Sequence, residues 1–239
     1  QGTLLVNKSE ITGNGASQVK NLRIAAKDGT AAQEPGADIK FAFAVDRKTQ
    51  VLTFNSIEVN AGLGQINVNQ GVLPLGEKTQ VPMSMDISAK NVDLEKVKPF
   101  AVLFASLPKE TQISGITESK ISLSSDKNIY KVKTDSTKIN GLKFVYPGEK
   151  PFDANEVSLV FEAEINPKEK TVNIKKLQLD SPQIKIRKGE FSKLTDAGKT
   201  KLTGQAELEY DWSALSVFTA PFLPEGLTLK GQRKDSVSF

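Results

Sequence analysis

The chain has 239 residues, 38% of them apolar, with a formal charge of +4 and neither cysteine nor histidine. The missing residue types exclude disulfides, thiolate chemistry, Ser-His-Asp triads and imidazole metal ligands. The charge surplus is too small for a typical nucleic-acid-binding surface, which needs dense Lys and Arg. We therefore expect a non-enzymatic protein with no cofactor, no catalytic or metal site and no nucleic-acid partner.

The chain begins with residues 1–4, whose pattern is that of a strand and not of a signal peptide. The longest apolar run, residues 100–107, is far shorter than the roughly 20 residues that span a bilayer. We expect any membrane anchor or export signal to lie outside this segment.

Most of the chain has the alternation of apolar and polar residues that is typical of half-buried strands. Phe41, Phe43 and Val45 share one strand face, and residues 157–165 repeat this pattern. Turn-forming residues separate the strands at residues 46–48, 126–128, 147–148 and 166–168. The pattern predicts an antiparallel meander.

Apolar residues at helical spacing interrupt the strand pattern at two places. Phe100, Leu103 and Phe104 follow a possible N-cap at Asp93, so the helix either kinks at Pro99 or begins there. The second such segment follows Asp211 and contains Trp212, Leu215 and Phe218. We expect one short helix at each place, packed against its sheet.

The apolar pattern repeats along the chain. Residues 19–66 align with residues 139–186 without a gap, at an offset of 120 residues. The copies share an irregularity, since the alternation slips by one residue between Phe54 and Ile57 and again between Ile174 and Leu177. Such a slip requires a bulge or turn, so its recurrence favours a true duplication.

The repeat defines the expected fold and domains. The fold class is mainly β with a few short helices, as two tandem repeats of an antiparallel, strongly curved sheet, each with one short helix. The first repeat spans residues 1–119 and the second residues 120–239, with residues 232–239 starting a third copy.

The apolar strand faces are the candidate site. They form either a core sealed under the helices or a surface that faces an apolar ligand. Leaving about 400 Å² of apolar surface in water costs on the order of 10 kcal/mol, and one short helix per repeat is too small to cover every strand. The candidate lipid-facing residues are Phe41, Phe43, Phe54, Ile57, Val59, Phe161, Ile174, Leu177 and Leu179.

Charged residues give a weaker signal. Glu162 and Glu164 alternate on one strand face, as do Glu207 and Glu209, and such pairs suit either acid chemistry or a solvated sheet face. Basic residues between positions 168 and 193 suit either anionic headgroups or guarded strand edges. In both cases we favour the solvated surface.

The chain resembles the AsmA-like family, which includes TamB-like envelope proteins. The resemblance lies in Ile11-Thr12-Gly13, in Asn91-Val92-Asp93-Leu94 before the helix, and in Leu107-Pro108 with Ile113-Ser114-Gly115 after it. Residues 211–212, 223–227 and 229–231 repeat the cycle. The resemblance implies a periplasmic segment of a protein anchored in the inner membrane of a Gram-negative bacterium. It also implies an open apolar groove that conducts phospholipid.

Two functions remain open from the sequence. The first is a lipid-binding or lipid-conducting groove module, with phospholipid or another acyl lipid and neighbouring repeats of the same parent chain as partners. The alternative is a structural or protein-interaction array with a sealed core.

Overall fold

The computed structural model describes residues 1–26, 29–76, 79, 81–104, 107–126, 129–147, 151–196, 199–212 and 231–238. One helix, α1 (Leu94–Phe104), lies between β6 and β7 in this part of the chain. The strands are β1 (Gly2–Val6), β2 (Glu10–Ala25), β3 (Ala31–Asp46), β4 (Val51–Ala61), β5 (Gly64–Pro74), β6 (Met83–Asp93), β7 (Gln112–Asp126), β8 (Ile129–Val145), β9 (Phe152–Asn166), β10 (Thr171–Asp180), β11 (Ile184–Asp196), β12 (Lys199–Asp211) and β13 (Gln232–Ser238).

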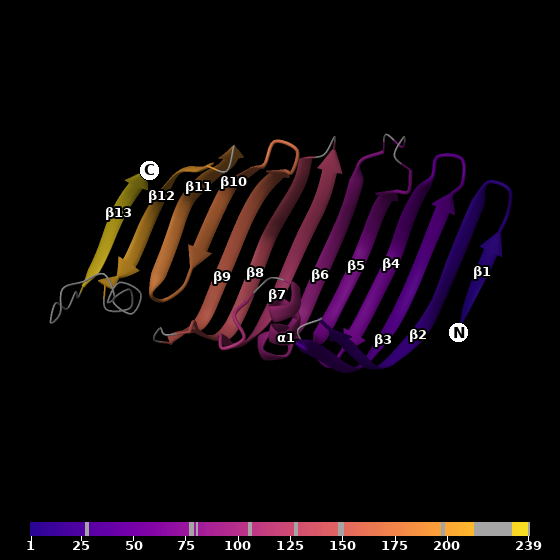
Figure 1. Ribbon diagram of the computed structural model, residues 1–239, viewed down its shortest axis with the longest axis horizontal. Coiled ribbons are helices and arrows are strands. Elements are labelled where there is room, and N and C mark those ends of the chain that lie inside the picture. The colour runs from indigo at the N-terminus through magenta and orange to yellow at the C-terminus, as the bar shows by residue number, and fades with distance from the viewer. Residues whose placement is uncertain are drawn as a thin grey trace.

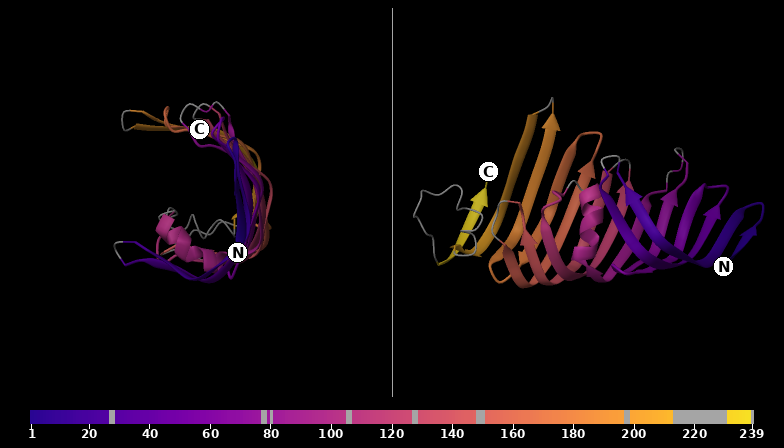
Figure 2. Two further views of the ribbon diagram at one scale, coloured as in Figure 1. Left: turned by 90° about the vertical axis from the view of Figure 1, so that its right-hand side faces the viewer. Right: turned by 60° about the horizontal axis from the view of Figure 1, so that its bottom comes forward.

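The strands form one antiparallel sheet in which each strand pairs with its neighbours in the chain, from β1 at one edge to β13 at the other (Figure 1). The sheet curls into a C, with α1 inside it (Figure 2, left). The described strands do not close into a barrel, since β1 pairs only with β2 and β13 only with β12. The predicted class, mainly β and antiparallel, is confirmed.

The described strands continue as one sheet across the expected boundary between the two repeats. The expected boundary between residues 119 and 120 falls inside β7, which pairs with β6 on one side and β8 on the other. A strand left unpaired at such a boundary would expose a row of N–H and C=O groups. Continuous pairing satisfies these groups.

Two turns have the same construction at equivalent places in the chain. After β3, Asp46 Oδ1 accepts the N–H groups of Lys48 and Thr49 at 2.8 and 2.9 Å. After β9, Asn166 Oδ1 accepts the N–H groups of Lys168 and Glu169, both at 3.1 Å. Each turn ends on a residue with positive φ, 54° at Gln50 and 53° at Lys170. Short Asp and Asn side chains stabilise such turns by bonding the backbone two and three residues ahead.

Bulges account for the bend of the sheet. The register shifts so that Asn55 of β4, Asn69 of β5 and Lys175 of β10 each have no direct partner on one neighbouring strand. An extra residue in one strand bends it and increases its twist. The predicted slips after Phe54 and after Ile174 are therefore confirmed as bulges.

Helix α1 begins where the sequence predicts a cap. Asp93 Oδ1 accepts the N–H of Glu95 at 3.0 Å, as an N-cap side chain does. The helix continues through Pro99, so the alternative in which it begins at Pro99 is wrong. The second predicted helix, after Asp211, lies outside the described residues except for Trp212. Among the described residues, no helix has the length and apolar character needed to cross a bilayer.

The interior of the described sheet is shallow. Its buried apolar residues are small: Ala32, Ala37, Val92, Ala154, Val157, Ala163 and Ala206. A single sheet with one short helix has no second layer to enclose the larger side chains. The large apolar residues therefore stay at the surface of one layer.

Candidate functional site

Cross-strand pairing aligns apolar side chains into rows across the sheet, since directly paired residues share a face. The longest row crosses twelve strands, from β1 to β12, and none of its members is charged or polar. This central row is Leu4, Gly13, Phe43, Phe54, Gly71, Met85, Leu123, Val132, Ala163, Ile174, Phe191 and Gly204.

Two further rows lie on the same face, one next to the central row and the other beyond it. One contains Phe41, Ile57, Val68, Ile87, Ile121, Thr134, Phe161 and Leu177. The other contains Ile39, Val59, Ile66, Ala89, Ser119, Thr137, Leu159, Leu179, Ile186 and Leu208. We call the face that carries these three rows the apolar trough.

All nine residues predicted to face lipid lie in these rows. Five come from β3 and β4 and four from β9 and β10, with the strands β5–β8 between the two groups. Each of the nine is half-buried, so none is sealed away from solvent and none is fully exposed. The trough therefore joins two predicted clusters into one surface.

Glycines pair with phenylalanines along the central row. A Cβ atom on Gly13 would lie 2.6 Å from the ring of Phe43, and one on Gly204 would lie 2.5 Å from the ring of Phe191. The rings thus lie over the neighbouring strands, in space that any other residue would fill. Sequence reasoning missed these glycines as site residues, because their partners become known only with the strand register.

The opposite face of the sheet is polar. Salt bridges join neighbouring strands there, between Lys40 and Glu58 at 3.9 Å and from Glu164 to Lys131 and Lys175 at 3.7 and 3.4 Å. Exposed pairs of this kind add little stability. Their presence agrees with our interpretation of Glu164 as part of a solvated sheet face.

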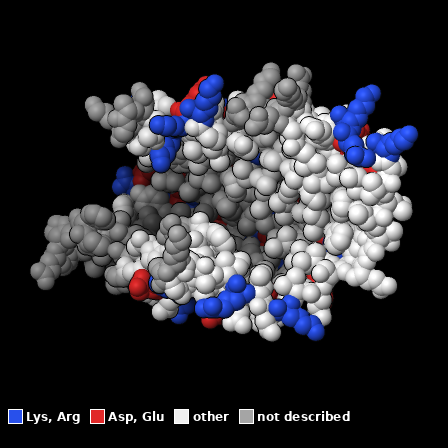
Figure 3. All heavy atoms as spheres, turned by 45° about the vertical axis from the view of Figure 1, so that its right-hand side comes forward, with Lys and Arg blue, Asp and Glu red and all other residues white. Residues whose placement is uncertain are grey.

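The two faces differ in shape as well as in charge. Figure 3 looks obliquely into the hollow of the C, whose visible lining shows few charged side chains, while Lys and Arg gather near its rims. This hollow is the side on which α1 lies in Figure 2. The trough is therefore concave and open.

Hydroxyl groups interrupt the apolar rows near β7 and β8. Thr137 Oγ1 lies 2.6 Å from Ser119 Oγ and 3.0 Å from Thr134 Oγ1. Thr134 is fully buried, at 0% exposure. Because the hydroxyls bond to one another, the polar groups are satisfied without a ligand.

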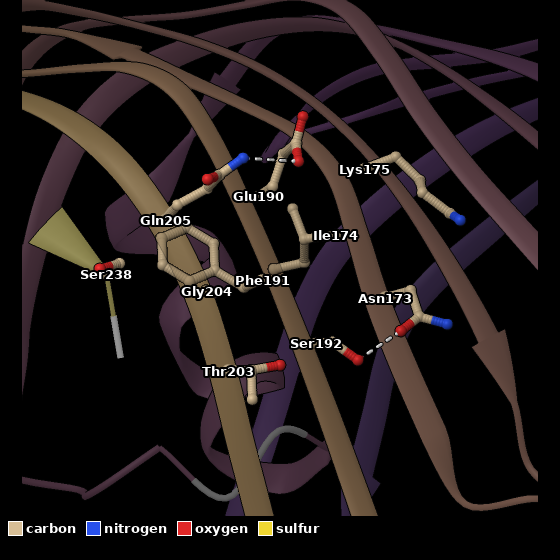
Figure 4. Close-up of a pocket in the computed structure, with 10 residues that line it drawn as sticks. All are labelled: Asn173, Ile174, Lys175, Glu190, Phe191, Ser192, Thr203, Gly204, Gln205 and Ser238. Carbon is tan, nitrogen blue, oxygen red and sulfur yellow. Dashed lines mark hydrogen bonds between the residues drawn. The ribbon is translucent and has the colours of Figure 1, made fainter. Parts of the chain in front are cut away.

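An open pocket of about 490 Å³ lies at the C-terminal end of the sheet, among residues of β10–β13 (Figure 4). Gln205 Nε2 donates to Glu190 Oε2 at 3.2 Å, and Ser192 Oγ donates to Asn173 Oδ1 at 2.7 Å. In Figure 4, the side chains of Phe191 and Asn173 point in opposite directions. These hydrogen bonds join the side chains of neighbouring strands across the pocket.

A polar cluster lies at the C-terminal end of the trough. Tyr210 donates its hydroxyl to Asp235 Oδ2 at 2.6 Å, and Arg233 Nε lies 3.0 Å from Asp235 Oδ1. The hydrogen bond from Tyr210 holds the pKa of Asp235 below its ordinary value and raises the pKa of Tyr210. Trp212 packs edge-on against Tyr210, with ring centroids 5.0 Å apart. The only tryptophan of the chain thus lies beside this end of the trough.

The trough offers mainly apolar contact surface. Within the described ranges, no three Asp or Glu side chains gather closely enough to hold a metal ion. No known protein family, curated protein or solved structure matches this chain. The shape and composition of the trough are therefore the basis for a functional proposal.

Proposed function

We propose that this chain is a non-enzymatic module that binds or conducts an acyl lipid along its apolar trough. One observation carries the proposal: a row of twelve uncharged, apolar residues crosses the concave face without interruption. Burial of apolar surface is favourable by roughly 25 cal/mol per Å², so a long apolar chain gains most from such a face. The polar opposite face keeps the module in water while the trough is loaded.

A structural array with a sealed core is the alternative. It requires the large apolar side chains to be covered, whereas all nine candidate residues are half-buried. This exposure supports the lipid-binding proposal over the alternative.

The proposal includes two tandem repeats within the single sheet. The equivalent turns at Asp46 and Asn166 and the equivalent bulges at Asn55 and Lys175 support it. Each member of a pair lies 120 residues from its counterpart in the chain.

We further propose, from the resemblance to AsmA-like proteins, that the module lies in the periplasm as part of an inner-membrane-anchored protein. Neighbouring repeats of the parent chain would extend the trough.

The first test asks whether the purified chain binds lipid. We expect native mass spectrometry and solvent extraction to detect phospholipid or fatty acid. We also expect a brominated fatty acid to quench the fluorescence of Trp212, because bromine quenches indole on contact and Trp212 lies at the end of the trough. A chain free of lipid whose Trp212 emission is unaffected by the brominated probe would refute the proposal.

A matched pair of variants localises binding to the trough. Phe54 lies in the central row, and the neighbouring Thr53 belongs to the opposite face. We expect Phe54→Glu to lower the number of fatty acid molecules bound per chain in native mass spectrometry and Thr53→Glu to leave that number unchanged, because only the first introduces a charge where the lipid lies. Circular dichroism checks that both variants fold, and Phe54→Ser serves as the milder substitution. Equal loss in both glutamate variants would contradict binding at the trough.

A further inference from the structure

Helix α1 does not behave as an ordinary core helix. None of its eleven residues is buried, although it lies against β3, β6 and β7. Phe104 at its end is 71% exposed. An amphipathic helix normally buries one apolar face against its sheet. The apolar side chains of α1 therefore have surface left for another apolar group.

The two halves of α1 differ in composition. The first turn contains Glu95 and Lys96, whereas the second half, residues 99–104, is entirely apolar: Pro-Phe-Ala-Val-Leu-Phe. No basic residue occupies the last turn, where a surface helix often has one. A water-exposed helix end would gain from polar residues, so the apolar half fits a place beside an apolar ligand.

The first half of α1 is fixed to the sheet. Lys96 Nζ donates to the carbonyl of Gly62 at 2.8 Å, and the Asp93 N–H donates to the carbonyl of Leu63 at 2.8 Å. Glu34, only 5% exposed, holds the same turn through the N–H of Gly62 at 3.0 Å. These bonds anchor the helix at its N-terminal end.

The second half lacks one of the bonds that would stiffen it. Pro99 has no N–H, so the carbonyl of Glu95 loses its helical partner. The helix lies inside the C (Figure 2). Its apolar half thus begins where one helical hydrogen bond is missing, and the helix lies within the space that the trough encloses.

We propose that residues 99–104 of α1 form a second wall of the lipid site and that Phe104 contacts the bound acyl chain. This inference rests on the proposed function, because the ligand is the acyl lipid of the trough. The sheet supplies the floor, and the apolar half of the anchored helix covers part of the chain that lies on it. A lipid held between floor and helix loses more apolar surface to water than one on the floor alone.

Binding of a fluorescent polyene fatty acid to the full chain tests the proposal. We expect Phe104→Ser to raise the Kd about tenfold, as the loss of one well-buried phenylalanine contact implies. Leu75→Ser is the control, since Leu75 is an exposed apolar residue at 55% exposure in the turn after β5. The control should bind as the unmodified chain does. Because Phe104 is exposed, both variants should keep their stability toward urea.

The outcomes separate this inference from the proposed function. If the unmodified chain binds no fatty acid, the proposed function fails and the inference with it. If it binds, and Phe104→Ser binds equally well, the second wall is refuted while the trough stands. Equal weakening in both serine variants also overturns the inference.

A second measurement uses the absence of cysteine from the chain. Phe104→Cys and Glu95→Cys each accept a polarity-sensitive fluorophore at opposite ends of α1. We expect saturating fatty acid to shift the emission of the label at position 104 to shorter wavelength and to leave the label at position 95 unchanged. Equal shifts at both ends, or none at position 104, would refute contact between the helix end and the acyl chain.

Discussion

The ring of Phe43 lies so close over Gly13 of the neighbouring strand that a Cβ atom there would sit 2.6 Å from Cε1 and Cζ. The same relationship recurs between Phe41 and Gly15 at 3.1 Å and between Phe54 and Gly71 at 3.2 Å. Each ring covers backbone that would otherwise be exposed, as in the rescue of strand glycines by aromatic residues. The rings therefore lie close against the backbone of the sheet, and the trough stays open above them.

This packing predicts a cost for a methyl group at Gly13. Gly13→Ala should lower the free energy of unfolding by about 1–3 kcal/mol, because the Phe43 ring must move away from the added Cβ. Gly36→Ala is the control, since a Cβ there meets only the Val19 carbonyl oxygen at 3.6 Å. Urea denaturation measures both. Equal stability of the two variants would contradict the close packing.

The carboxylate of Glu34 predicts a second stability effect. It accepts the N–H of Gly62 at 3.0 Å and that of Gly36 at 3.2 Å while it is almost fully buried. Glu34→Ala should cost about 1–3 kcal/mol, because both N–H groups lose their partner. Glu34→Gln retains an acceptor oxygen and should cost less. Urea denaturation of the two variants compares them, and an equal loss would show that the acceptor is unimportant.

The Asp46 turn predicts a local dependence on acid. The Thr49 N–H bound to Asp46 holds the pKa of its carboxyl below the ordinary value of 3.8. A depressed pKa means that the ionised form stabilises the turn above pH 3.8, and this stabilisation is lost as the pH falls through the lower, folded-state value. We expect the hydrogen-exchange protection of the Thr49 amide to fall in that range.

The Asn166 turn is the internal control for this effect. Its amide oxygen accepts the N–H of Glu169 at 3.1 Å and does not titrate. Protection at Glu169 should therefore stay constant over the same pH range, and Asp46→Asn should make the first turn behave like the second. Parallel loss of protection at both turns would indicate general acid unfolding instead.

The length of the trough predicts how much ligand it holds. The central row crosses twelve strands, which at a spacing of about 4.8 Å gives a floor of roughly 50 Å. One acyl chain spans about half of a hydrocarbon core of roughly 30 Å. We expect native mass spectrometry at increasing fatty acid concentration to show more than one bound molecule per chain. Saturation at a single molecule would mean that only part of the trough binds.

Local features of the fold were predictable from the sequence. The slip between Phe54 and Ile57 indicated a bulge, because a side-chain period of two cannot absorb an extra residue otherwise. Asp93 gave the start of the helix, because a cap side chain bonds the backbone directly after it. Each of these features depends on residues only a few positions apart, so it can be predicted from the sequence alone.

Features that depend on strand register were not predictable. Gly13 and Phe43 meet across β2 and β3, and nothing in the spacing of either residue reveals that contact. The tie between Lys96 and Gly62 joins a helix to a distant turn in the same way. The continuity of the sheet was not predictable either, because periodicity predicts strands but not whether the last strand of one repeat pairs with the first strand of the next. All nine candidate residues lie on one face because alternation fixes the face of each strand.

The order of the strands in space follows their order in the chain, so every strand pairs only with the strands beside it. The stability of such an arrangement is the sum of contributions from neighbouring strands. Folding that nucleates at any one hairpin can then propagate to the strands on either side. A pair of strands inserted or removed would lengthen or shorten the molecule without disturbing distant parts. Evolution would then adjust its reach in steps of one hairpin.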